Sequence, residues 1–175
     1  MAWFKKKISA GQLGSSLALL SFTQANFLDE KLQSTSEIAQ LPEEEKSDLH
    51  IELIIFSLFT IVAGVRSAVS DEAIQKIILD KMHESVYEMF VDTSGMGIRE
   101  LELFQQHIHD KYVSYYNALQ EHEGGHAMTM LGKQFVDNAF GANLLLVKPM
   151  LYIPIHYVNL AAEVKNMIEN FKIRQ

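Results

Sequence analysis

The sequence predicts an all-α protein: a single-domain, irregular bundle of about six helices around one buried central helix. Three observations lead to this fold class. Glycine and proline are scarce, at 9 and 3 of 175 residues, so loops should be short and helices continuous. Apolar residues recur at steps of three and four in several segments. No segment shows the alternation of a half-buried β-strand.

One domain accounts for the whole length, residues 1–175. A chain of this size buries about 70% of its unfolded surface, so its core needs neither a disulfide nor a structural metal. No repeat, low-complexity tract or linker divides it. Residues 1–10 are expected to form a flexible tail of basic and aromatic residues.

Six segments carry a helical pattern. They are residues 11–29, 42–69, 72–91, 98–121, 127–140 and 155–171. The clearest pattern is in 98–121, where Leu101, Phe104 and Ile108 share one face and polar residues occupy the other. The weakest is in 11–29, because glycines and serines interrupt it.

The second segment should supply the central helix. Ser34 to Glu37 has the form of a capping box, and Pro42 suits the first position of the long helix that follows. From Leu53 to Val65 this helix has 13 residues without a charge. A membrane span needs about 20 apolar residues, so the run is expected in a protein core.

The turn at Ser70 and Asp71 should cap the third helix. A sharp turn there predicts that the second and third helices are antiparallel neighbours. Ile78 of the third helix lies on its apolar stripe, and Ile77 and Phe104 are also assigned to the core.

The C-terminal region combines an irregular stretch with an amphipathic helix. Pro149 and Pro154 bracket a stretch that should be kinked and partly exposed. The helix after it has a narrow apolar seam of Tyr157, Ala161, Val164, Ile168 and Phe171. Such a seam fits between two helices, so it closes the bundle or pairs with a second subunit.

Composition excludes several kinds of function. The chain has no cysteine, so it has no thiol nucleophile, disulfide or thiolate metal site. Its formal net charge of -7 disfavours nucleic-acid binding, because the only basic run is Lys5 to Lys7. The prediction is a soluble, cytoplasmic protein that does not bind nucleic acid.

The N-terminus allows two minority interpretations. Lys5 to Lys7 followed by the apolar Leu17 to Phe22 resembles a weak secretory signal, but Gly14 and its neighbours shorten the apolar part below the usual length. Trp3 and the lysines could instead give weak contact with an anionic membrane surface. The prediction keeps these residues as a solubilising tail.

One string matches a catalytic motif. His122-Glu123-Gly124-Gly125-His126 has the H-E-x-x-H spacing, in which two histidines bind zinc and the glutamate activates a water. The chemistry requires a rigid helix and a third protein ligand. The two glycines disfavour the helix, and no third ligand is evident from spacing, so a polar inter-helix loop is the favoured interpretation.

Aromatic and sulfur-containing residues offer a second candidate. The tyrosines and methionines that could line an apolar ligand pocket are Tyr112, Tyr115, Tyr116, Met128 and Met130. Such residues more often belong to the core. No catalytic, metal-ligating or cofactor-binding residue is therefore assigned, and no cofactor is expected. The leading hypothesis is a non-enzymatic protein that binds a protein partner or itself. The alternatives are a zinc-dependent hydrolase and a binder of a small apolar ligand.

Overall fold

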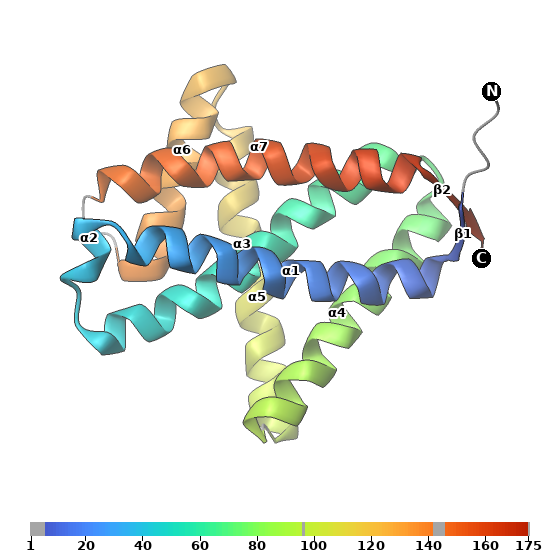
Figure 1. Cartoon of the computed structure of the whole chain (residues 1–175), viewed down its shortest axis with the longest axis horizontal. Helices are drawn as coiled ribbons and strands as arrows, with labels where there is room; N and C mark the ends of the chain where they lie inside the picture. Colours follow the sequence, from blue (N-terminus) through green and yellow to red (C-terminus); the bar gives the residue numbers. More distant parts are fainter. Residues whose placement is uncertain (1–5, 96, 142–145, 175) are drawn as a thin grey trace.

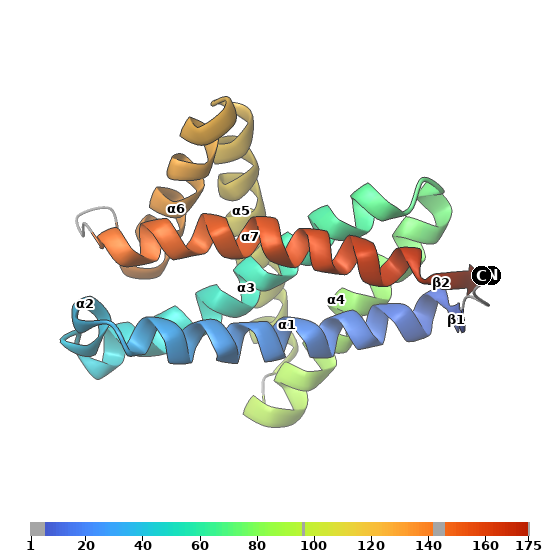
Figure 2. The same ribbon diagram turned by 45° about the horizontal axis from the view of Figure 1, so that its top comes forward.

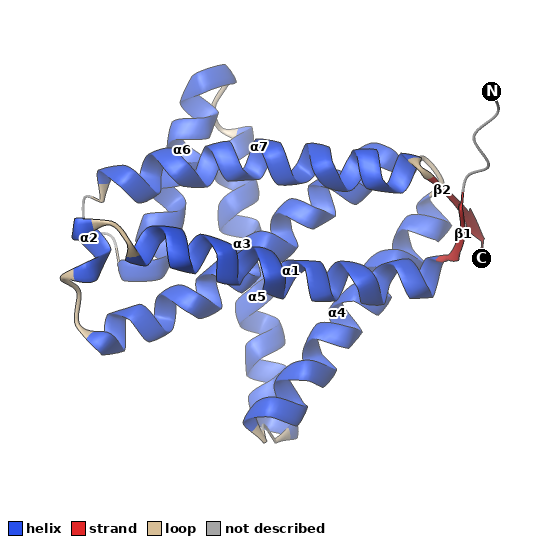
Figure 3. Ribbon diagram, in the orientation of Figure 1, coloured by secondary structure: helices blue, strands red, loops and turns tan. Residues whose placement is uncertain are grey.

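The structure is a bundle of helices tied at one end by a two-stranded parallel sheet (Figure 1; Figure 3). The computed structural model describes residues 6–95, 97–141 and 146–174. In these ranges the elements are β1 Lys6–Ser9, α1 Ala10–Gln33, α2 Ser36–Ala39, α3 Glu43–Ala68, α4 Glu72–Ser94, α5 Ile98–Gln120, α6 Gly124–Phe140, α7 Val147–Glu169 and β2 Phe171–Arg174. The predicted all-α bundle is confirmed, with the short α2 added to the six expected helices.

Helix α3 is the buried centre of the bundle, as predicted. Helices α1, α5, α6 and α7 all pack against it. Its Phe56 and Phe59 rings contact Tyr115, and Phe56 also contacts Phe135. By length and composition, the part from Leu49 to Ala68 could cross a membrane, but 72% of its most apolar window is buried by the rest of the chain. This burial fits the role of a core helix.

Helix α4 packs along α1 and makes little contact with α3. The predicted contact between the second and third helices is therefore slight, and the main neighbour of α4 is α1. Helix α4 packs on α1 because Gly14 of α1 lets the backbones of α1 and α4 approach closely. A Cβ atom at position 14 would be 2.5 Å from the carbonyl oxygen of Ile78. The glycine that weakened the helical pattern of 11–29 is thus a packing site.

Helix α7 is continuous from Val147, so the expected irregular stretch is helical. Pro149 lies in the first turn, where its missing N–H leaves no hydrogen bond unmade. Pro154 lies inside the helix and cannot donate to the carbonyl of Met150. That carbonyl faces α6 instead, and a Cβ atom on Gly132 would be only 2.2 Å from its oxygen.

The strands β1 and β2 were not predicted. They pair in parallel with Lys6 opposite Phe171 and Ile8 opposite Ile173. Part of the expected flexible tail is therefore a strand, and Phe171 belongs to β2 and not to the last helix. Residues 1–5, including Trp3, Phe4 and Lys5 of the membrane-contact and signal-peptide interpretations, lie outside the described residues.

Helix boundaries differ from the prediction by one or a few residues. Thr35, not Ser34, caps α2 and accepts a hydrogen bond from the amide of Ile38. Pro42 is the N-cap of α3 instead of its first residue. Asp71 caps α4 as expected. Ile77 is 42% exposed, so its assignment to the core was wrong.

Candidate functional site

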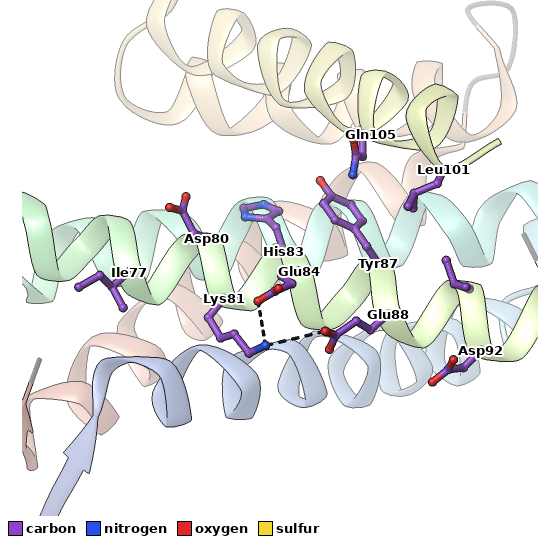
Figure 4. Close-up of a pocket in the computed structure, with 11 residues that line it drawn as sticks. Ile77, Asp80, Lys81, His83, Glu84, Tyr87, Glu88, Asp92, Leu101 and Gln105 are labelled. Atoms are coloured by element: carbon purple, nitrogen blue, oxygen red, sulfur yellow. Dashed lines mark hydrogen bonds and ion pairs between the residues drawn. The ribbon is translucent and has the colours of Figure 1, made fainter. Parts of the chain in front are cut away.

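The largest described cleft lies between α4 and α5. The two helices diverge from the turn at Gly95 (Figure 1; Figure 2). The cleft has a volume of about 1060 Å³. Side chains of α4 from Ile77 to Asp92 line most of it, and Leu101 and Gln105 project into it from α5 (Figure 4).

Carboxylates dominate the rim of this cleft. Asp80, Glu84, Glu88 and Asp92 follow one another at steps of four along α4, and Lys81 is the only cation in the lining. The Lys81 ammonium lies 2.8 Å from Glu84 and 3.9 Å from Glu88 (Figure 4). The hydrogen bond to Glu84 raises the pKa of Lys81 above its usual value. The α4 wall is therefore an acidic surface.

His83 joins α4 to α5 beside the cleft. Its Nδ1 is 2.8 Å from the Leu79 carbonyl, so Nδ1 carries the proton and donates it. Its Nε2 is 3.0 Å from the Tyr112 hydroxyl and accepts from it. Burial lowers the pKa of His83 and raises the pKa of Tyr112. His83 and Tyr112 are thus both neutral, and both ring nitrogens of His83 are hydrogen-bonded. This arrangement suits a structural link better than acid–base catalysis.

A buried polar network crosses α3, α5 and α6. Glu52 is 2% exposed, and one carboxylate oxygen accepts from the Tyr115 hydroxyl while the other lies 3.2 Å from Lys111 Nζ. Lys111 also donates to the carbonyl of Asn138 at 2.9 Å. Burial and the Glu52 carboxylate raise the pKa of Tyr115 well above its usual value. The network is largely buried and links three helices.

The outer face of α7 is apolar and exposed. It consists of Val147, Leu151, Ile155 and Val158, which follow at steps of four, four and three and are 50–62% exposed. Between Lys148 and Glu163 the helix has no aspartate, glutamate, lysine or arginine. A groove of about 330 Å³ runs beside this face against α6, and no charged side chain lines it. We call these four residues the α7 face.

His156 lies on the other side of α7, where α7 runs alongside α1 (Figure 2). Its Nε2 is buried and has no hydrogen-bond partner among the described residues. Burial, and secondarily the positive charge of Lys31, lower the pKa of His156 to about 4. The ring is therefore neutral at pH 7.

Acidification should weaken the fold through His156. Its folded pKa lies below the unfolded value, so the unfolded chain takes up the proton first and stability falls as the pH drops from about 6.5 toward 4. The loss should reach about 2–3 kcal/mol. Urea unfolding at pH 7.5 and 4.5 measures it. His156→Gln should remove this share of the pH dependence, while the exposed His107→Gln should leave it intact.

The H-E-x-x-H string does not lie on one helix. His122 precedes α6, Glu123 is its N-cap, and Gly124 begins it with a positive φ of 54°. The rings of His122 and His126 contact each other at a centroid distance of 4.6 Å. Among the described residues no third histidine, aspartate or glutamate joins them to form a metal-binding group. Only His122 and Glu123 lie in the inter-helix loop, whereas Gly124, Gly125 and His126 form the first turn of α6, so the predicted loop is shorter than expected.

The candidate tyrosines and methionines do not share a pocket. Tyr115 belongs to the buried network, Tyr112 bonds His83, and Tyr116 accepts from Arg66. Met128 lines the separate groove beside the α7 face. The three tyrosines instead surround Phe59 in the core, as the more common role of such residues predicts.

Sequence reasoning missed Glu52 and Lys111. Glu52 directly precedes the uncharged run from Leu53 to Val65 and was given no role. It precedes Phe56 and Phe59 by four and seven residues, which places a carboxylate on the most buried face of α3. That spacing is the signal that could have identified a buried ion pair.

Comparison of the chain with protein-family models, curated proteins and solved structures finds no match.

Proposed function

We propose that this protein acts by binding another protein chain through the α7 face, and not by catalysing a reaction. The observation that carries the proposal is the unpaired apolar stripe of Val147, Leu151, Ile155 and Val158 on a helix whose opposite face is already buried. A helix that is apolar on both faces is normally covered on both. Exposed apolar patches of this kind are typical of protein-interaction sites.

Of the two roles considered for the apolar seam of the last helix, closing the bundle is the one that its burial supports. Val164 and Ile168 are buried, and α7 packs against α3 through this side. The surface left for a partner is the one lined by Leu151 and Ile155. The partner is then another protein or a second copy of this chain, and either would cover the apolar side chains.

Charge introduced into the α7 face should abolish binding. In Leu151→Glu/Ile155→Glu, two side chains expected at the centre of the contact become charged, and each such position typically contributes about 2 kcal/mol or more. Binding should weaken at least 100-fold. The matched control is Leu103→Glu/Val113→Glu, since these α5 side chains are also exposed.

Two measurements distinguish a second copy of this chain from another protein as the partner. Sedimentation of the purified protein reports self-association, and capture from a cell extract reports other partners. Loss of either signal in the α7 variant alone supports the proposal. Equal sedimentation and equal capture by wild type, α7 variant and control would contradict it.

A small apolar ligand is the second candidate function. The groove lined by Met128, Met150, Leu151 and Pro154 has a volume of about 330 Å³, which is at the lower end of the usual range for ligand pockets. A ligand there would be extracted by organic solvent and identified by mass spectrometry. Its presence in wild type and absence in Leu151→Glu/Ile155→Glu would favour this function.

We also propose a cytoplasmic location. Cleavage after Ala25 at the weak signal would remove the part of α1 that buries Leu13 and Leu17 in the core. Fractionation of cells that express the full chain tests the location.

A further inference from the structure

We propose that the α4–α5 cleft is a second docking surface, for a basic amphipathic helix of a partner protein. This inference goes beyond the α7 face and depends on different residues. It follows from the shape, the apolar floor and the charge of the cleft.

The shape suits an elongated segment. The cleft follows α4 from Ile77 to Asp92, a distance of roughly 22 Å or four helical turns. Its volume of about 1060 Å³ is at the upper limit for small-molecule pockets. A helix laid along α4 would use the whole length, whereas a compact ligand would fill only part of it.

The floor supplies apolar contact. Ile77 is 42% exposed at one end of the cleft, and Tyr87, Val91 and Leu101, which are half-buried, line it further along. Figure 4 shows Tyr87 extending from α4 toward Gln105 of α5. Ile77 and Val91 are two heptads apart, so apolar residues at helical spacing on a partner could meet both.

The carboxylates of the rim determine that the partner must carry positive charge. Four carboxylates at steps of four lie about 6 Å apart along α4. Lys76 pairs with Asp80 at 2.6 Å and Lys81 pairs with Glu84 and Glu88, so two cations face four carboxylates, and Asp92 forms no ion pair with any described residue. Lysine or arginine at the same spacing on a docked helix would face these carboxylates, and such complementary charges steer association.

A second copy of this chain does not fit this groove. The chain has a formal net charge of -7, so two copies repel each other overall, and the cations grouped on β1 and β2 (Lys6, Lys7, Lys172 and Arg174) lie on strands and not on an amphipathic helix. The same charge repels nucleic acid. A basic partner helix is the occupant that meets both the apolar floor and the rim.

Binding of a designed peptide tests the proposal. The probe is a fluorescein-labelled 18-residue helix with leucine on one face and lysine flanking it, and the control peptide has glutamate in place of lysine. Fluorescence anisotropy should show binding of the lysine peptide alone. The affinity should fall as salt is raised from 50 to 300 mM, because exposed charges are screened.

Variants of the rim locate the site. Glu84→Gln/Glu88→Gln should weaken binding about tenfold, since two exposed ion pairs with the peptide are lost. Ile77→Ser should weaken peptide binding severalfold, because it removes apolar contact area from the floor of the cleft. Glu102→Gln/Glu121→Gln changes the net charge equally at exposed positions outside the cleft and should leave binding unchanged.

The inference is overturned if both peptides bind alike or if the lysine peptide does not bind. It is also overturned if the rim variant and its control lose the same amount of binding affinity. Loss of binding only in Leu151→Glu/Ile155→Glu would assign the peptide to the α7 face and also reject the cleft. Because the two variants act on separate helices, failure at one surface does not imply failure at the other.

Discussion

Replacing Lys111 with methionine should destabilise the protein by about 3–5 kcal/mol, because it leaves the Glu52 carboxylate without its cation inside the bundle. The side chain of Glu52 is only 3% exposed and that of Lys111 only 17%, so water can do little to solvate the unpaired carboxylate. Methionine keeps the length and the apolar contacts of lysine, so the loss reports the charge together with the hydrogen bond to the Asn138 carbonyl. Tyr115 still donates to Glu52 but cannot neutralise it.

A double-mutant cycle isolates the pair. Glu52→Gln/Lys111→Met removes both charges and retains an acceptor for the Tyr115 hydroxyl, so it should regain most of the lost stability. Urea unfolding monitored by circular dichroism gives each free energy. Lys81→Met, which breaks an exposed pair, should cost less than about 1 kcal/mol. A loss below about 1 kcal/mol for Lys111→Met would show that the buried pair does not stabilise the core.

Gly132→Ala should destabilise the protein by about 2–3 kcal/mol, because the added methyl group meets backbone and not a movable side chain. Its carbon would lie 2.2 Å from the Met150 oxygen and 2.9 Å from the Met150 carbonyl carbon. Helices α6 and α7 would have to separate by a large fraction of an ångström, and the contacts around Leu131 and Ile153 would loosen with them.

Gly125→Ala is the matched control. Gly125 also lies in α6, its φ is not positive, and nothing approaches its Cβ position within 4 Å. Alanine favours helix over glycine, so this change should be neutral or stabilise the protein by a few tenths of a kcal/mol up to about 1 kcal/mol. The difference between the two midpoints in urea measures the packing effect. Equal stability of the two variants would mean that the helices separate at no cost.

The long helices could be predicted because their signals are local. The uncharged run from Leu53 to Val65 identified the central helix, and the periodicity of Leu101, Phe104 and Ile108 identified α5 within one residue of each end. Both depend on burial of one contiguous face. Cap positions were less accurate, since Ser34 and Thr35 can each accept a bond from the next turn.

The features that the sequence did not reveal are non-local. Pro154 suggests a break, but packing of the Met150 carbonyl on Gly132 of another helix accommodates it. Strand β1 pairs with a segment at the opposite end of the chain, and four residues are too few for a recognisable alternation. Neither case can be resolved from neighbours in the sequence.

The candidate surfaces were only partly predictable. The apolar seam of residues 155–171 predicted an amphipathic C-terminal helix, but which side would be covered depended on the position of α3. The row from Asp80 to Asp92 is readable as a solvated face. Its role as a cleft rim depends on the divergence of α4 from α5, which periodicity does not encode.

The pairing of β1 with β2 joins the two ends of the helical part of the chain by backbone hydrogen bonds. Lys6 lies opposite Phe171, so nearly the whole polypeptide is enclosed between two hydrogen-bonded ends. Closing so large a loop has an entropic cost of several kcal/mol that four-residue strands alone repay poorly. Docking of α1 and α7 on α3 first brings the ends together and removes most of that cost. We therefore expect the sheet to form after the helices have docked and to open before they separate, which slower hydrogen exchange in α3 than in β1 and β2 would show.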